Sequence, residues 1–65
     1  MRILVNGCWR ETEAAELAAA LAELGYGDAA VSTAVNGEFV ALAHRTSTRL
    51  AEGDRVEVLA PMQGG

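Results

Sequence analysis

The residues best suited to take part in a reaction stand at the end of this sequence. Pro61-Met62-Gln63 is followed by Gly64 and Gly65, which carry no Cβ. Such an arm can enter a narrow channel and bring a terminal carboxylate to another protein's active site, at an entropic cost that binding must offset. A carboxylate becomes an acyl donor once ATP and Mg²⁺ convert it to an acyl adenylate, from which a thiolate or persulfide displaces AMP. The two glycines could equally be a frayed end or a remnant of cloning.

Two other side chains could take part in chemistry, the single cysteine and the single histidine. Cys8 could accept sulfur, but a lone cysteine beside a turn is more often a small apolar filler or an incidental surface thiol. His44 has no Cys or Asp close to it in sequence, so we expect a solvent-exposed side chain. One Cys and one His cannot form a disulfide framework or supply four zinc ligands. We therefore expect no catalytic residue, no metal site and no bound cofactor in the chain.

Composition narrows the classes of function further. With 65 residues the chain has room for one domain, over residues 1–60, followed by a flexible tail over 61–65. Nine acidic and five basic residues give a net charge of −4, which argues against partners such as nucleic acid or an anionic membrane. The sequence shows no long apolar run, so we expect a cytoplasmic protein. All the basic residues except His44 are Arg, so no lysine amine is present to accept an isopeptide bond.

The elements that must position the end of the chain can be read from turns and periodicity. Two Asn-Gly pairs, at 6–7 and 36–37, favour type I′ hairpin turns because both central residues need a positive φ. Alternating apolar residues predict a last strand that ends near Pro61. The predicted strands cover residues 1–6, 8–12, 29–36, 38–42 and 55–60.

A helix is predicted over residues 13–24, which are rich in Ala, Glu and Leu. Leu17, Leu21 and Leu24 recur at i, i+4 and i+7 and form one apolar stripe. Thr12 is the expected N-cap and Gly25 the expected residue after the C-cap. Residues 43–50 show no clear period and read as a connection with room for one helical turn. Strands with one helix on one face predict an α+β domain of order β-β-α-β-β-β.

Four short segments carry a family resemblance. They are Met-Arg-Ile-Leu-Val-Asn-Gly at 1–7, Val-Asn-Gly-Glu at 35–38, Glu-Gly-Asp-Arg-Val-Glu-Val-Leu at 52–59 and Met-Gln-Gly-Gly at 62–65. In order and spacing, over essentially the full chain, they resemble the sulfur-carrier proteins of thiamine (thiazole) biosynthesis. This resemblance implies a ubiquitin-like β-grasp fold, a mixed sheet of about five strands in which the first and last strands are central and parallel.

The resemblance also implies a role for the end of the chain. An E1-like adenylyltransferase would activate the carboxylate of Gly65, and a cysteine desulfurase or rhodanese-type donor would supply the sulfur of a thiocarboxylate. Thiazole synthase would then receive that sulfur. The chain would be a protein cosubstrate and not an enzyme, with Met62, Gln63 and Gly64 as the arm that leads to the modified residue.

Alternatives remain open at this point. The small subunit of molybdopterin synthase is similar in fold and tail, and a ubiquitin-like modifier or a plain interaction module belongs to a different class of function. The hairpin registers predict a partner-binding patch on the helix-free face of the sheet, made of Leu4, Phe39 and Leu59 and extended by Trp9. A register slip of one residue would turn these side chains into the core instead.

Overall fold

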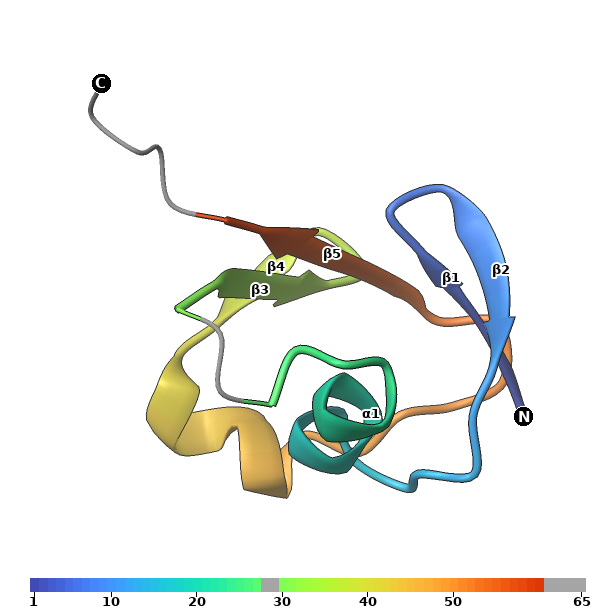
Figure 1. The fold of residues 1–65 in the computed structure, drawn as a ribbon, viewed down its shortest axis with the longest axis horizontal. Helices are drawn as coiled ribbons and strands as arrows, with labels where there is room; N and C mark the ends of the chain where they lie inside the picture. Colours follow the sequence, from blue (N-terminus) through green and yellow to red (C-terminus); the bar gives the residue numbers. More distant parts are fainter. Residues whose placement is uncertain (28–29, 61–65) are drawn as a thin grey trace.

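The computed structural model describes residues 1–27 and 30–60, which form one mixed sheet with two helices on the same side of it (Figure 1). The elements in chain order are β1 (Arg2–Val5), β2 (Cys8–Glu11), α1 (Leu17–Glu23), β3 (Ser32–Val35), β4 (Glu38–Val40), the 3₁₀-helix η1 (Leu42–Ser47) and β5 (Arg55–Leu59). The strand order is β2-β1-β5-β3-β4, and β1 and β5 are parallel neighbours. The predicted β-grasp arrangement is therefore confirmed. The predicted tail falls on residues 61–65, outside the described residues.

Both hairpins turn on the predicted Asn-Gly pairs. Asn6 and Asn36 have φ of 48° and 52°, and the glycines after them have φ of 83° and 84°. Positive φ at both central residues is the type I′ geometry, whose twist matches that of the strands it joins. The resulting registers pair Leu4 with Trp9 and Ala34 with Phe39, as the two-residue loops predicted.

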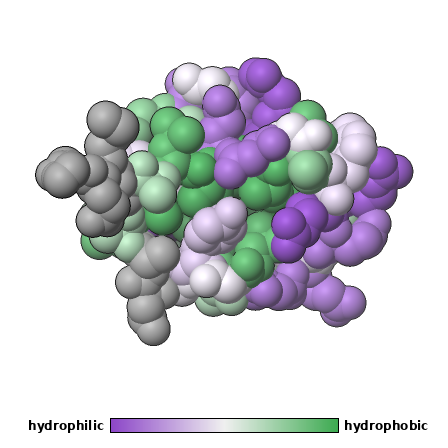
Figure 2. Space-filling model, turned by 45° about the horizontal axis from the view of Figure 1, so that its top comes forward, coloured by the Kyte–Doolittle hydropathy of each residue, from purple (hydrophilic) through white to green (hydrophobic). Residues whose placement is uncertain are grey.

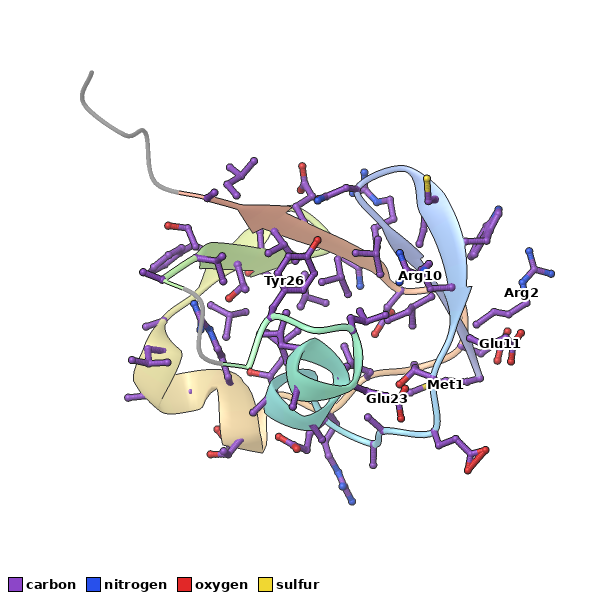
Figure 3. The ribbon with its side chains drawn as sticks, in the orientation of Figure 1. Met1, Arg2, Arg10, Glu11, Glu23 and Tyr26 are labelled. Carbon is purple, nitrogen blue, oxygen red and sulfur yellow. The ribbon has the colours of Figure 1, made fainter. Side chains whose placement is uncertain are left out.

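The core lies between the sheet and the helices. Ile3 and Val5 of β1 and Val56 and Val58 of β5 alternate inward and are at most 5% exposed. Helix α1 packs its apolar stripe against them, with Leu17 fully buried. Figure 3 shows the ring of Tyr26 extending from the end of α1 towards the sheet, where it packs on this cluster. Both helices lie on this side of the sheet, and none of residues 1–27 and 30–60 forms a layer over the opposite face (Figure 1).

Helix α1 begins later than the sequence predicts. The prediction of a helix from residue 13 with Thr12 as N-cap is wrong, because Glu16 caps the helix by accepting a 2.9 Å hydrogen bond from the Ala19 N–H. Backbone bonds hold the preceding segment against the chain before β5. The Leu17 N–H donates to the Thr48 carbonyl, and the Leu50 N–H donates to the Ala15 carbonyl. This pairing between distant segments outweighs the helix propensity of Glu and Ala.

The helix ends as predicted. Gly25, with φ of 96°, follows the C-cap Leu24 and donates to the Ala22 carbonyl, while the Tyr26 N–H donates to the Leu21 carbonyl. These two bonds form a Schellman motif, which satisfies carbonyls that the helix itself leaves free.

All five predicted strands extend beyond the observed ones. The strand predicted over 29–36 begins at Ser32, which pairs with Leu59, the last residue of β5, and its first predicted residue, Ala29, lies outside the described residues. The strand predicted over 38–42 ends at Val40, because the chain enters η1 at Leu42. The connection predicted over 43–50 is mostly this 3₁₀-helix.

Candidate functional site

The candidate site lies on the face of the sheet that no helix covers. Strand β5 runs through this face and alternates, with Val56 and Val58 buried below and Arg55, Glu57 and Leu59 exposed above. Figure 2 shows hydrophobic side chains forming a broken patch on the side of the molecule that includes this face, with hydrophilic side chains interleaved. Exposed apolar side chains gathered in this way are typical of a surface that contacts another protein.

Phe39 and Leu59 frame a shallow hollow on this face. Phe39 is 72% exposed and Leu59 is 66% exposed, so the strand registers do not slip and neither side chain belongs to the core. The two residues stand on either side of β3, because Phe39 pairs with Ala34 and Leu59 pairs with Ser32. The hollow between them has a volume of about 110 Å³. We call it the Phe39–Leu59 hollow; its use by a partner stays a prediction.

The other half of the predicted patch lies apart from this hollow. Leu4 is half-buried and pairs with Trp9, which is 53% exposed on the edge strand β2. The Arg2 guanidinium carbon lies 4.6 Å from the centre of the Trp9 ring, a distance typical of a cation–π contact. Figure 3 shows Arg2 reaching outward beside β2. Leu4 pairs with Arg55 at the start of β5, whereas Leu59 is the last residue of that strand. The structure therefore groups Phe39 with Leu59 but places Leu4 outside their hollow.

Glu57 is the one charged residue among those that line the hollow. Its carboxylate forms no ion pair with the residues the structure describes, and these include every Arg and the single His of the sequence. Arg55, two positions earlier on the same face, leans towards the β3–β4 turn, where its Nη2 lies 3.9 Å from where a Cβ on Gly37 would be. The hollow thus combines apolar walls with an uncompensated negative charge.

A buried arginine that sequence reasoning did not identify supports this hollow from the helix side of the sheet. Arg45 of η1 is only 8% exposed; its Nε donates to the Thr33 hydroxyl over 3.1 Å and its Nη2 donates to the Val31 carbonyl over 2.6 Å. The Thr33 hydroxyl in turn donates to the Val40 carbonyl over 2.9 Å. These bonds tie η1 to the β3–β4 hairpin that carries Phe39. No local pattern in residues 43–50 distinguishes this arginine from a surface one.

The two other candidate side chains are both exposed. Cys8 is a free, exposed thiol at the start of β2. His44 is exposed on η1, where its carbonyl accepts bonds from the Ser47 and Thr48 hydroxyls. Residues 1–27 and 30–60 hold no group of three side chains of the types that bind metal ions. The predicted reactive residue, Gly65, and the arm Met62, Gln63 and Gly64 lie outside the part of the chain that the structure describes.

Within that same part, no helix has the length and apolar character needed to cross a membrane.

Comparisons with known proteins agree on one family. The profile of the ThiS family matches residues 3–65. Among solved structures, the chain is similar to the crystal structure of the thiamine biosynthesis protein ThiS from Geobacter metallireducens, with a TM-score of 0.83 and 30% sequence identity. That alignment covers 100% of both chains. A search of curated proteins gave no match.

Proposed function

The chain belongs to the ThiS family, and we propose that this sulfur carrier of thiamine biosynthesis holds its sulfur as a thiocarboxylate on Gly65. The observation that carries the proposal is the family match through residues 3–65, because it includes both glycines that end the sequence. Without a Cβ, these residues fit the narrow approach to an adenylation site. The chemistry requires a partner's active site and asks no acid, base or metal of the carrier.

The loading reaction follows from the poor reactivity of a carboxylate. A Gly65 carboxylate oxygen attacks the α-phosphorus of ATP and pyrophosphate leaves, giving an acyl adenylate. The terminal sulfur of a persulfide then attacks the carbonyl carbon, and the bond to AMP breaks to give an acyl disulfide. A thiol reduces the S–S bond, which leaves a thiocarboxylate on Gly65 and a disulfide on the donor. An E1-like adenylyltransferase with Mg²⁺ performs the first step, and a cysteine desulfurase or rhodanese-type protein supplies the persulfide.

Thiazole synthase receives the sulfur in this proposal, and the Phe39–Leu59 hollow is the surface by which the carrier docks on its partners. When a partner covers apolar side chains this exposed, the free energy of the complex falls because apolar surface is removed from water. The uncompensated carboxylate of Glu57 favours a partner with a basic group opposite it. We also propose a cytoplasmic setting, where thiols such as Cys8 and the persulfide donor stay reduced.

Intact-mass measurement tests this function. The full chain is incubated with the adenylyltransferase, ATP, Mg²⁺ and a persulfide donor. We expect an AMP adduct first and then replacement of one oxygen by sulfur. A matched chain that lacks Gly65 should show neither change, while its thermal melt stays the same because the core between the sheet and α1 is intact. Loading of the truncated chain at the normal rate would contradict the proposal.

Adding candidate acceptor proteins to the same reaction separates the other classes of function. A ubiquitin-like modifier would become attached to a lysine of another protein, and an interaction module would keep its function after loss of Gly64 and Gly65. A molybdopterin-type carrier would pass its sulfur to a molybdopterin synthase large subunit and not to thiazole synthase. Each outcome differs from sulfur transfer to thiazole synthase in the mass or the acceptor observed.

A further inference from the structure

Asn6 makes two hydrogen bonds that its role in the hairpin turn does not require. Its Nδ2 donates to the Val58 carbonyl over 3.0 Å, and its Oδ1 accepts from the Val58 N–H over 2.8 Å. The backbone of β1 leaves the sheet at this residue, whose N–H still donates to the Val56 carbonyl. The side-chain amide therefore takes the place of the peptide group that a longer β1 would have offered. It satisfies both polar groups of Val58 on that edge of β5.

Asn36 makes a comparable pair of side-chain hydrogen bonds at the opposite end of β5. Its Oδ1 accepts from the Arg55 N–H over 3.0 Å, and its Nδ2 donates to the Asp54 carboxylate over 3.0 Å. Both asparagines occupy the first central position of a type I′ turn and have nearly the same φ. They differ in which end of β5 they hold. Asn36 holds the start of the strand, and Asn6 holds Val58, close to where the chain leaves the sheet (Figure 1).

We propose that Asn6 is a positioning residue for sulfur loading, which rests on the function proposed above for Gly65. Parallel pairing with β1 ends with the turn at Asn6, so without its side chain Val58 would have no partner on that edge. The last residues of β5 would then be held by β3 alone, through the pairing of Leu59 with Ser32. Asn6 therefore holds Val58 two residues before the end of the described chain at Ala60, which precedes the arm that carries Gly65. A small loss of alignment at a reacting group has a large effect on rate, because productive geometry requires close placement of the reacting atoms.

A matched pair of variants tests this assignment. Asn6→Gly and Asn36→Gly both leave a Gly-Gly sequence that accepts a type I′ turn, and both remove two side-chain hydrogen bonds to the region of β5. The rate of adenylate formation is measured as a function of carrier concentration, with the adenylyltransferase and ATP, alongside the thermal melt. Hydrogen exchange of the Val58 amide reports directly on the bond that Asn6 accepts.

We expect similar losses of melting temperature in both variants but different kinetics. Asn6→Gly should lower kcat for adenylation about tenfold, with KM within about twofold of the wild type because Phe39 and the hollow remain. Asn36→Gly should keep both constants within about twofold. Exchange at Val58 should rise in Asn6→Gly only. Asn6→Asp keeps the acceptor for the Val58 N–H but loses the donor to the Val58 carbonyl. Its kcat should therefore lie between the kcat values of Asn6→Gly and Asn36→Gly.

Equal kcat values for Asn6→Gly and Asn36→Gly would overturn the positioning role while leaving the function of Gly65 intact. A rise in KM with kcat unchanged would also overturn it, since that would make Asn6 part of the docking surface. Failure of the wild-type chain itself to form an adenylate would overturn the proposed function and the role of Asn6 together. The measurement on the wild-type chain therefore distinguishes failure of the positioning role from failure of the proposed function.

Discussion

The two faces of the sheet are made from the same five strands, but one face is buried and the other carries exposed side chains. Below the sheet, Ile3, Val56 and Leu17 are at most 1% exposed and packed against one another. Above it, Phe39 and Leu59 are of comparable apolar character and more than 60% exposed. The inner face thus supplies stability, while the outer face leaves apolar surface exposed, where we propose that a partner binds. Substitutions on each face can separate these two uses of apolar side chains.

The largest effect should come from the inner face. Leu17→Ala should lower the free energy of unfolding by about 2–5 kcal/mol, because it leaves a cavity in a core with little volume to spare. Leu42→Ala is the matched control, since Leu42 is 75% exposed and the same atoms are removed. It should change stability by about 0.5 kcal/mol or less. Chemical denaturation measures both, and equal losses would break the distinction between the faces.

Arg45 connects the two faces, because it is buried on the helix side of the sheet and also holds the hairpin that carries Phe39. Arg45→Ala should cost about 2–3 kcal/mol of unfolding free energy through the loss of its bonds to Thr33 and Val31. The exposed Arg49, changed to Ala, should cost about 0.5 kcal/mol or less. Denaturant titration of the two variants checks this. A neutral Arg45→Ala would show that the hairpin is held by its own pairing alone.

On the outer face the effect should appear in binding. Phe39→Ala should weaken the affinity for the adenylyltransferase by about tenfold to a hundredfold, since it removes an exposed aromatic anchor. The thermal melt should change little. Trp9→Ala changes an exposed aromatic side chain on the other half of the face and should weaken binding less. Calorimetric titration with the partner measures both, and a stronger loss for Trp9→Ala would move the docking site to β1 and β2.

The smallest effect is expected at the single cysteine. Cys8→Ser should leave both stability and sulfur loading unchanged, because the thiol is exposed on an edge strand and the proposed acceptor is Gly65. Intact-mass measurement of the loaded variant is the check. Loss of loading would make Cys8 a relay for sulfur and would weaken the case for a carrier without reactive side chains.

Much of the fold could be predicted from the sequence, because its strongest signals are local. Asn6-Gly7 and Asn36-Gly37 each fix a turn, and the turn fixes which strand residues face outward. That is why the exposed position of Phe39 followed from the sequence, while that of Leu59 followed from the alternation of the last strand, with Val56 and Val58 facing inward. The parallel pairing of β1 with β5 did not follow from periodicity and came from the family resemblance.

The missed features depend on contacts between distant segments. The late start of α1 arises from the pairing of residues 15–17 with 48–50, which no window of local sequence contains. The burial of Arg45 depends on the carbonyl of Val31 and the hydroxyl of Thr33 lying within its reach. The Asn-Gly pairs likewise predicted the turns but not the side-chain hydrogen bonds that Asn6 and Asn36 make to the region of β5.

Locating the sulfur on the loaded wild-type chain tests the central claim most directly. After incubation with ATP, Mg²⁺, the adenylyltransferase and a persulfide donor, the chain is fragmented in the mass spectrometer. We predict that every fragment containing Gly65 carries sulfur in place of one oxygen and that fragments containing Cys8 but not Gly65 keep their original mass. Added sulfur on Cys8, or on any residue other than Gly65, would contradict the account.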